Sequence, residues 1–466
     1  MGPSENFMNQ PVIIIGGGIS GLTVAYRLEQ AQVPYLLLEA GTQLGGNIRT
    51  VERAGFLYDV GPDSFLRAKK PGEELCRELG LSEELIVPQD HGRSVWVAHD
   101  GRLFPMPEGL TLGVPKRPWP LLNTPLLSPM GKCRALLEPW VPARQSPEEE
   151  SIAQFLSRRL GTEMAERLAA PLLSGVFAGD AQALSMDAAF GQMVLLEKKY
   201  GSLFSGMNGG KSPFSVLFEA VKDAPSPFVS LARGLGSLVD ALVATLPEQK
   251  LQLQTRVQSI VREGEGYCVT SDRGRLSARA VVVAGPPWMA AELVSGLSRA
   301  LSDTLAEIRG FQTATVYFAL HEEQMDHHAS GSGFIVPPGE GEILAATFVS
   351  SKWQGRAPAG RALLRAFVGG ARVDISSLSS AQLEQVAHRE LTRFLGPLGP
   401  VEFSAVYRYE KGTPQPELGH KRRLAHVQSC LAKLPGVSLI GSGYGAVGIP
   451  DCIAQANEVA ARQSAG

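Results

Sequence analysis

Residues 12–21 read Val12-Ile13-Ile14-Ile15-Gly16-Gly17-Gly18-Ile19-Ser20-Gly21, a short apolar run followed by a glycine turn into a predicted helix. The next apolar run, at 36–38, ends in the acidic residue Glu39. In this spacing Gly16 permits a tight turn, Gly18 lets the backbone approach a pyrophosphate, and Gly21 lets the helix pack close to the strand. The helix N-terminus then faces the phosphates, and Glu39 accepts hydrogen bonds from ribose hydroxyls. The segment predicts a dinucleotide-binding unit, with an incidental glycine turn as the alternative.

The residues after Glu39 favour a flavin over a nicotinamide cofactor. Gly45-Gly46, followed by Arg49, resembles the second phosphate-contacting element of FAD enzymes similar to amine oxidases. Near the C-terminus the apolar run 437–440 precedes a second glycine loop, 441–448, and a helical stripe at 451–462. A glycine turn into a helix start can hold the negative end of a flavin ring, and a plain connecting loop is the alternative. We therefore predict FAD as the cofactor.

The predicted FAD contacts come from these glycine segments and from the turns beside them. They comprise the N-terminal turn, the acidic residue and its neighbour, the second phosphate element, the turn at 61–64, one residue of a middle strand and the C-terminal loop. These are Gly16, Gly18, Ile19, Ser20, Gly21, Glu39, Ala40, Gly45, Gly46, Arg49, Gly61, Pro62, Asp63, Ser64, Val257, Gly441, Val447, Gly448 and Ile449.

Length and composition indicate a folded protein of several domains. A chain of 466 residues, 44% of them hydrophobic, is too long for a single core. The 44 basic and 46 acidic residues leave no basic surface typical of nucleic-acid binding. The five cysteines are widely spread without a C-x-x-C pair, which favours a reducing compartment over a disulfide framework. No hydrolase, metalloprotease or P-loop motif is present, and no metal site is predicted.

The alternation of predicted helices and strands indicates a multidomain fold of the α/β and α+β classes. Residues 9–66, 228–288 and 425–466 are expected to form a discontinuous, Rossmann-like FAD-binding domain. Residues 67–90 and 289–424 are expected to form a mixed-sheet substrate-binding domain. The region 91–227 is predicted to be mainly helical, with a capping-box sequence at 146–149 before the helical stretch 151–173.

Part of this helical region, residues 101–145, has an unusual composition. It interleaves prolines and apolar residues such as Trp119, Leu121 and Trp140 with lysines and arginines. Such a segment can lie on a membrane of anionic lipid, and a proline-rich excursion packed over another domain or a partner surface are the alternatives. No apolar run is long enough to span a bilayer, and residues 1–10 do not resemble a secretory signal. We expect a cytoplasmic protein peripheral on the membrane, or an organellar one in its mature form if the source is eukaryotic.

Two neighbouring segments carry a resemblance to a known family. Residues 171–180, Pro-Leu-Leu-Ser-Gly-Val-Phe-Ala-Gly-Asp, and 184–191, Leu-Ser-Met-Asp-Ala-Ala-Phe-Gly, look like the signature of the flavin-dependent protoporphyrinogen oxidases. Residues 412–415, 418–420 and 451–453 match as well, so the resemblance extends from residue 12 to residue 456. It implies an oxygen-dependent FAD oxidoreductase, acting on CH–CH donors in haem or tetrapyrrole biosynthesis. Such an enzyme oxidises protoporphyrinogen IX to protoporphyrin IX in three two-electron rounds and produces hydrogen peroxide.

The resemblance also implies roles for five residues. Arg93 matches the anchor for a substrate propionate, a task that suits a guanidinium. Gly175 matches the catalytic position whose backbone carbonyl faces the pyrrole nitrogens. Ile335, Leu344 and Trp353 match the apolar slot for the tetrapyrrole. The alternatives are a solvated arginine, a helix stop at the glycine, and core packing of the apolar residues.

The chain departs from the family pattern at Pro416 and Pro450, and Pro450 removes a backbone N–H donor just before the last predicted helix. A coproporphyrinogen III oxidase of the same superfamily is the near alternative, and an amine oxidase or carotenoid desaturase is a more distant one. A flavin-binding, membrane-associated protein without turnover is the alternative of another class. A homodimer is an oligomeric state that the sequence leaves open.

Overall fold

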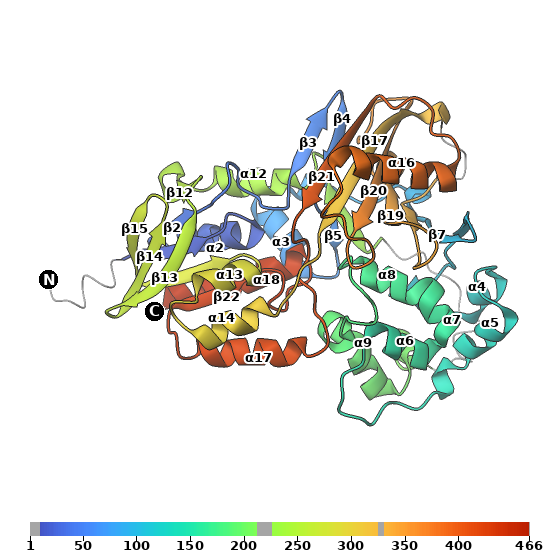
Figure 1. Cartoon of the computed structure of the whole chain (residues 1–466), viewed down its shortest axis with the longest axis horizontal. Coiled ribbons are helices and arrows are strands. Elements are labelled where there is room, and N and C mark those ends of the chain that lie inside the picture. Colours follow the sequence, from blue (N-terminus) through green and yellow to red (C-terminus); the bar gives the residue numbers. More distant parts are fainter. Residues whose placement is uncertain (1–9, 212–225, 325–329, 466) are drawn as a thin grey trace. The chain divides into compact units, whose positions relative to one another are not determined.

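The computed structural model describes residues 10–211, 226–324 and 330–465. It divides into two compact units, each assembled from segments far apart in the sequence (Figure 1). The first comprises Met1–Val87, Pro227–Arg309 and Lys421–Gly466, and the second comprises Pro88–Ser226 and Gly310–His420. The expected and observed boundaries differ, because residues 67–87 and 289–309, expected in the substrate-binding domain, cluster with the first unit. The expected helical region and residues 310–420 of the expected substrate-binding domain belong together in the second unit.

A five-stranded parallel sheet is the centre of the first unit, with the strand order β12-β2-β1-β16-β22. Its strands are β1 (Val12–Ile15), β2 (Tyr35–Leu38), β12 (Leu251–Gln252), β16 (Ala280–Ala284) and β22 (Val437–Ile440). Val12 and Ile14 pack into one core cluster, and Ile13 and Ile15 pack into another. Both faces of the sheet are covered, and this explains why its strands are continuous apolar runs rather than alternating apolar and polar residues.

The two faces of this sheet have different covers. Helices α2 (Ile19–Gln30), α12 (Gly236–Ala244) and α18 (Ile449–Ala465) contribute to the cluster around Val12 and Ile14, and α18 packs along α2. The other cluster includes a three-stranded antiparallel sheet and residues of helices α13 (Pro287–Leu293), α14 (Arg299–Ala306) and α17 (His420–Leu431). That sheet comprises β13 (Val257–Glu263), β14 (Gly266–Ser271) and β15 (Gly274–Ala278).

Small elements complete the first unit. The hairpin β3 (Thr50–Arg53) and β4 (Phe56–Asp59) follows the second glycine segment. Strand β11 (Phe228–Leu231) pairs with both β5 (Phe65–Leu66) and β6 (Leu85–Ile86), with α3 (Lys70–Glu78) and η1 (Ser82–Glu84) between these two. This pairing and the packing of α3 against α18 explain why residues 67–87 belong to the first unit. The short helix η5 (Glu248–Lys250) precedes β12.

A seven-stranded mixed sheet forms part of the second unit, with the order β21-β17-β20-β19-β18-β7-β8. Its strands are β7 (Val95–His99), β8 (Arg102–Pro105), β17 (Thr313–His321), β18 (Gly333–Ile335), β19 (Ile343–Phe348), β20 (Arg361–Gly369) and β21 (Phe403–Tyr409). All neighbours are antiparallel except β18 and β7. Helix α16 (Ser380–Leu395) packs on one face, where Phe334 and Phe348 enter the core. Helices η2 (Asp90–Arg93), α15 (Val349–Lys352) and η6 (Glu322–Gln324) lie beside the strands in the sequence.

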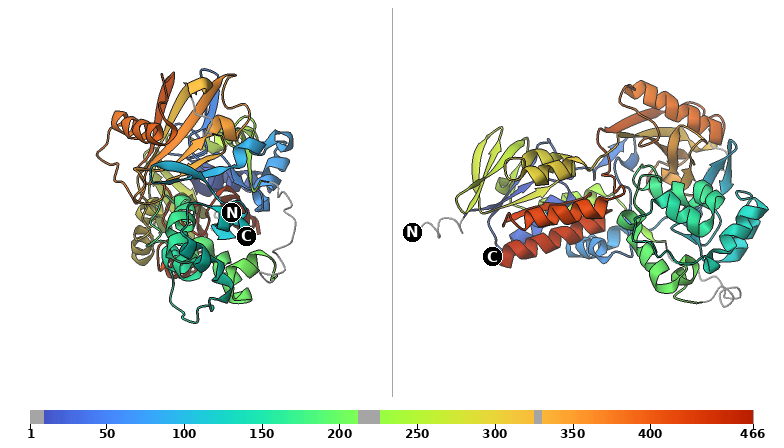
Figure 2. Two further views of the ribbon diagram at one scale, coloured as in Figure 1. Left: turned by 90° about the vertical axis from the view of Figure 1, so that its right-hand side faces the viewer. Right: turned by 60° about the horizontal axis from the view of Figure 1, so that its bottom comes forward.

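Most of the other described elements of the second unit are helices, and Figure 2 shows them grouped apart from α16. They are α4 (Pro118–Asn123), α5 (Pro129–Leu136), η3 (Glu138–Trp140), α6 (Ile152–Leu160), α7 (Thr162–Met164), the π-helical η4 (Ala165–Ala169), α8 (Ala170–Gly175), α9 (Met186–Tyr200) and α10 (Leu203–Met207), with the small hairpin β9 (Leu110–Thr111) and β10 (Val114–Pro115). A capping box is formed by Ser151 and Gln154 at the start of α6, not by residues 146–149. None of the described helices is long and apolar enough to cross a membrane.

Buried charges connect these helices. The Arg159 side chain is fully buried, forms an ion pair with Glu138, and lies 3.2 Å from Glu197. The Glu138 carboxylate also accepts hydrogen bonds from the Leu203 and Phe204 amides, at 2.8 and 3.1 Å. Because a buried charge requires a partner, this network ties η3 to α6 and α10.

Candidate functional site

The N-terminal glycine turn leaves no room for side chains at two positions. Gly16 has a φ of +107° and its N–H donates to the Leu38 carbonyl at 2.8 Å. A Cβ on Gly16 would overlap the Ala284 carbonyl oxygen of β16, and a Cβ on Gly21 would overlap the Gly16 carbonyl oxygen. Both glycines therefore let α2 start directly at the carboxyl edge of the sheet.

Gly18 differs from these two glycines because the space around it is open. A Cβ on Gly18 would meet no other atom within 4 Å. Gly18 is the N-cap of α2, without a side-chain cap and without an acidic residue in the first turn of the helix. Open space beside uncapped N–H groups at a helix start suits a phosphate.

The second predicted phosphate element lies against the first. Gly45 forms a bridge with Gly18 and donates its N–H to the Gly17 carbonyl at 2.7 Å. Gly46 has a φ of +59°, and a Cβ on it would come within 3.2 Å of the Gly18 Cα. The two glycine segments thus form one backbone cradle, and the residues present fit the pyrophosphate of a dinucleotide.

Glu39 lies beside this cradle. Its Oε2 accepts a hydrogen bond from the Gly17 N–H at 2.7 Å, and its Oε1 accepts one from the Gly41 N–H at 2.6 Å. Each carboxylate oxygen retains acceptor capacity for a ribose hydroxyl. The main chain after Glu39 is fixed as well, because the Thr255 N–H donates to the Glu39 carbonyl at 2.8 Å.

The other predicted cofactor residues of the N-terminal half lie in the same unit. The Val60 N–H donates to the Arg49 carbonyl at 2.9 Å, just before the turn that begins at Gly61-Pro62. In that turn the Ser64 hydroxyl donates to Asp63 Oδ1 at 2.8 Å, and the Ser230 hydroxyl donates to the Asp63 carbonyl. Ala40 follows Glu39, Ile19 and Ser20 open α2, and Val257 begins β13.

The C-terminal glycine loop follows β22 and leads into α18. Its Val447 and Gly448 N–H groups both donate to Asp451 Oδ2, at 3.1 Å. Gly441 donates its N–H to the Gln455 side chain. A flavin contact from this loop would therefore use groups other than these three amides, and the Ile449 N–H, at the first position of α18, is such a group.

The predicted substrate residues belong to the second unit. Arg93 ends η2, and its side chain lies outside the part of the chain that the structure describes. Gly175 ends α8, is exposed, and accepts a hydrogen bond from the Ala178 N–H on its carbonyl at 3.2 Å. Ile335 in β18 and Leu344 in β19 are half-buried and lie on neighbouring strands. Trp353 is fully buried, which supports the core-packing interpretation for this residue.

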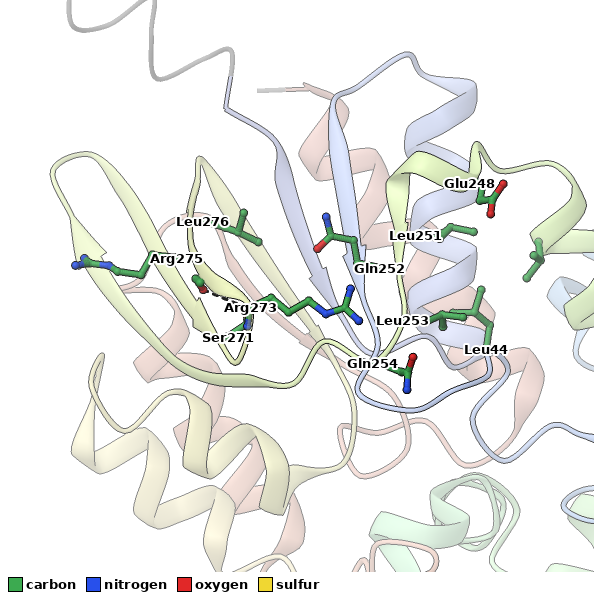
Figure 3. Close-up of a pocket in the computed structure, with 12 residues that line it drawn as sticks. Leu44, Glu248, Leu251, Gln252, Leu253, Gln254, Ser271, Arg273, Arg275 and Leu276 are labelled. Carbon is green, nitrogen blue, oxygen red and sulfur yellow. Dashed lines mark hydrogen bonds between the residues drawn. The ribbon is translucent and has the colours of Figure 1, made fainter.

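A cavity of about 820 Å³ lies elsewhere in the first unit, between the edge strand β12 and the β14–β15 hairpin. Figure 3 shows Arg273 extending from that hairpin toward Gln252 and Gln254 of the edge segment. None of the predicted cofactor residues lines this cavity.

One group of ligand-type side chains stands close together among the described residues: His99, Asp100 and Glu340. The His99 Nδ1 lies 2.9 Å from Glu340 Oε1, and the Asp100 N–H donates to Glu340 Oε2 at 2.9 Å. These hydrogen bonds account for the proximity of the three residues.

Comparison with known proteins gives the family. The family described as "flavin containing amine oxidoreductase" matches residues 19–462. The chain belongs to this family. This flavoenzyme is 35% identical to a coproporphyrinogen III oxidase of Bacillus subtilis (strain 168), over 95% of this chain and 96% of that one. It is 34% identical to a chloroplastic protoporphyrinogen oxidase of Nicotiana tabacum, over 96% of this chain and 84% of that one.

Solved structures show the same fold for this flavoenzyme. A putative protoporphyrinogen oxidase from Exiguobacterium sp. 255-15 has 30% sequence identity and a TM-score of 0.85, covering 98% of this chain and 99% of that one. Cyclohexylamine oxidase from Brevibacterium oxydans IH-35A has a TM-score of 0.71 at 17% identity, which shows the fold alone. The prediction of an amine-oxidase-like FAD fold and the prediction of FAD as cofactor are confirmed. The membrane-associated region stays a prediction.

The site contains residues that the sequence interpretation missed. Asp451 and Gln455 face the C-terminal glycine loop from α18, and Lys69 contacts Asp451. An acidic residue in the first turn of a helix is a sequence signal for Asp451. No sequence signal marks Lys69 or Gln455, because their partners are distant in the chain or are backbone atoms.

Proposed function

We propose that this flavoenzyme oxidises a porphyrinogen to the corresponding porphyrin in tetrapyrrole biosynthesis, consuming oxygen and producing hydrogen peroxide. One observation carries the proposal: porphyrinogen oxidases match 95% or more of the chain at 34–35% identity, and so cover both units. Amine oxidases of the same fold fall to 17% identity. The resemblance of residues 171–191 to the protoporphyrinogen oxidase signature points the same way.

We propose protoporphyrinogen IX as the substrate. The signature segment, the relative in Nicotiana tabacum and the name of the Exiguobacterium protein support it. Coproporphyrinogen III is a second candidate, favoured by the bacterial relatives in Bacillus subtilis and Propionibacterium freudenreichii, at 35% and 31% identity. The two substrates differ in carboxylate number, so the cations of the second unit would discriminate between them.

The chemistry divides between cofactor and protein. FAD supplies the two-electron acceptor that no amino-acid side chain provides. The protein binds the flat macrocycle, orients it and excludes water. In our proposal the Arg93 guanidinium holds a propionate with two hydrogen bonds, and the Gly175 carbonyl orients the pyrrole N–H groups. That carbonyl has one acceptor position left, because the Ala178 N–H occupies the other.

The direct test is turnover of the purified, FAD-loaded chain with each porphyrinogen in air. We expect porphyrin fluorescence above the spontaneous background together with hydrogen peroxide, and a higher kcat/KM for protoporphyrinogen IX. A higher kcat/KM for coproporphyrinogen III would transfer the assignment to the second candidate. Bound FAD without turnover of either substrate would contradict the proposal and favour a non-catalytic flavin-binding protein.

We also propose that the helices within residues 101–145 dock on a membrane surface from the cytoplasmic side. The docking surface is defined by exposed apolar side chains of α4, α5 and η3 and of the residue before η3. They are Trp119, Leu122, Met130, Leu137 and Trp140, with exposed fractions of 38–82%. Leu121, which the composition of the segment also suggested, is fully buried.

The basic residues of the segment contribute less to this surface than the composition suggests. Lys132 Nζ donates to the Leu122 carbonyl at 2.8 Å, and the Arg134 guanidinium donates to two carbonyls of α6. These cations are committed within the chain. The proposed docking therefore rests first on the apolar side chains, and the positive charge that these cations keep would add attraction to anionic lipid.

Flotation with lipid vesicles tests the docking surface. We expect wild type to float with neutral vesicles, and Trp119→Glu combined with Met130→Glu to abolish flotation while FAD stays bound. Leu195→Glu is the matched control, because Leu195 is 66% exposed but lies on α9. Equal flotation of all three proteins, or the absence of flotation in wild type, would contradict the proposal.

A further inference from the structure

Three side chains hold the C-terminal glycine loop, residues 441–448, in one conformation. We propose that Lys69, Asp451 and Gln455 are positioning residues that preform this loop for the flavin, with Lys69 acting through Asp451. The proposal rests on FAD as the cofactor and on the predicted place of this loop beside the flavin. It concerns the first unit alone, where α18 packs against both α2 and α3 (Figure 1).

Asp451 fixes the end of the loop. Its Oδ2 accepts the N–H groups of Val447 and Gly448, both at 3.1 Å. The Lys69 ammonium, at the N-cap of α3, lies 2.7 Å from Oδ1 and 2.6 Å from Oδ2 of the same carboxylate. One half-buried carboxylate therefore joins the loop, the start of α18 and the start of α3.

Gln455 fixes the beginning of the loop. Its Oε1 accepts the N–H of Gly441 at 3.1 Å, and its Nε2 donates to the Tyr444 carbonyl at 2.7 Å. Gln455 lies about one helical turn after Asp451, so both side chains reach the loop from the same helix. The amide group of one side chain thus spans the first and fourth residues of the loop.

The loop needs such support because of its glycines. Gly441, Gly443 and Gly445 have φ values of +119°, +99° and +94°. Free glycine adopts positive φ about as readily as negative φ, so its own preference does not hold the backbone in this conformation. A segment with three such residues loses much conformational entropy when it is ordered. If the loop were ordered only by the cofactor, that loss would weaken FAD binding, whereas the contacts of Asp451 and Gln455 order it beforehand.

Lys69 has an additional electrostatic consequence. The N-terminus of a helix carries partial positive charge, which favours negative charge on a neighbouring ligand. Asp451 alone would cancel this effect at the start of α18. Since Lys69 neutralises Asp451, the start of α18 keeps its positive character. A neutral residue in place of Lys69 should therefore make the flavin harder to reduce.

The first experiment compares Lys69→Met with Lys69→Arg in the FAD-loaded protein. Lys70→Met is the matched control, because Lys70 is exposed and makes no hydrogen bond or ion pair among the described residues. We expect Lys69→Met to raise the FAD dissociation constant, measured by equilibrium dialysis, by about tenfold, and to lower the flavin midpoint potential. Lys69→Arg keeps the positive charge, so it should leave both the dissociation constant and the midpoint potential close to their wild-type values. Values for Lys69→Met equal to those of Lys70→Met would overturn the role of Lys69.

The second experiment separates loop order from charge. Gln455→Leu removes both hydrogen bonds without changing charge, and Gln428→Leu on α17 is its control. We expect Gln455→Leu to raise the FAD dissociation constant by about tenfold, with circular dichroism unchanged and a smaller change in midpoint potential than in Lys69→Met. An unchanged dissociation constant would overturn the role of Gln455. A wild-type chain that turns over no porphyrinogen contradicts the proposed function, whereas the FAD measurements test the positioning residues separately.

Discussion

Replacing Gly18 by valine should remove the cofactor without unfolding the protein. A Cβ on Gly18 meets nothing within 4 Å, and the φ of −74° with a ψ of −179° is extended backbone that valine adopts. The free energy of unfolding of the cofactor-free chain should therefore change by no more than about 1 kcal/mol. The valine methyl groups would instead occupy the open space at the start of α2, where the pyrophosphate must approach.

The magnitude of the effect on FAD binding follows from the interactions that the valine blocks. Helix α2 has neither a side-chain cap nor an acidic residue in its first turn, so its N–H groups are available to phosphate. Two charge-assisted hydrogen bonds contribute about 1.5–3 kcal/mol each, and the helix dipole about 0.3–1 kcal/mol. Loss of these contacts, about 3–7 kcal/mol in all, should weaken FAD binding roughly 300-fold to 100,000-fold. The purified variant should be colourless, with a wild-type circular dichroism spectrum.

Gly21→Ala provides the contrast. A Cβ at Gly21 would overlap the Gly16 carbonyl oxygen, so the helix must move away from the sheet. This variant should lose both FAD and thermal stability, whereas Gly18→Val should lose only FAD once both are compared as cofactor-free proteins. Full flavin occupancy in Gly18→Val would refute the placement of the pyrophosphate at this turn.

Three further outcomes can be measured. Arg159→Met should lower the free energy of unfolding in urea by about 3–5 kcal/mol, because it leaves the buried Glu138 carboxylate without its cation. Burial alone would raise the pKa of the Glu150 carboxyl. The hydrogen bonds and charges of Arg158 and Arg144 outweigh the effect of burial and lower this pKa below the usual value of 4.5. Because the folded pKa is depressed, this stabilisation is present above pH 4.5 and is lost as the pH falls through the folded pKa, so Glu150→Gln should flatten the acid limb of the stability profile. Gly175→Ala should keep the fold and FAD, since a Cβ there meets nothing within 4 Å, and should lower kcat/KM for the porphyrinogen, because that Cβ would occupy the open space beside the carbonyl proposed to orient the substrate.

The dinucleotide unit could be predicted because its physical requirements are local. Gly16, Gly18 and Gly21 stand at a recognisable spacing within one strand–turn–helix segment. The structure gives Gly21 a close approach to the Gly16 carbonyl, Gly16 a close approach to Ala284 of β16, and Gly18 open space. The position of Glu39 follows from the length of one helix and one strand. Requirements of this kind appear in a single stretch of sequence.

Contacts between distant segments could not be predicted in this way. A local signal can also be ambiguous: residues 146–149 and 151–154 each contain a serine followed three residues later by an acidic or amide residue, and only the second stretch forms the capping box. Lys69 lies far from Asp451 in the sequence, and only the packing of α3 against α18 brings them together. Neither the composition nor the spacing of residues in the sequence predicts an ion pair between residues so far apart.

The segment 101–145 shows why composition alone could not define a docking surface. Leu121 and Leu122 are adjacent in the sequence, yet the first is fully buried and the second is 38% exposed. Contacts with residues outside the segment hold it in place, among them the ion pair between Glu138 and the fully buried Arg159 of α6. Since a buried carboxylate cannot rotate toward solvent without leaving its partner unpaired, this ion pair stabilises the orientation of η3 in which Trp140 is exposed. The buried ion pair thus helps to fix how the helices are oriented, and that orientation decides which apolar residues are exposed. A substitution that disrupts Glu138 should consequently alter membrane binding as well as stability, although Glu138 itself never reaches the surface.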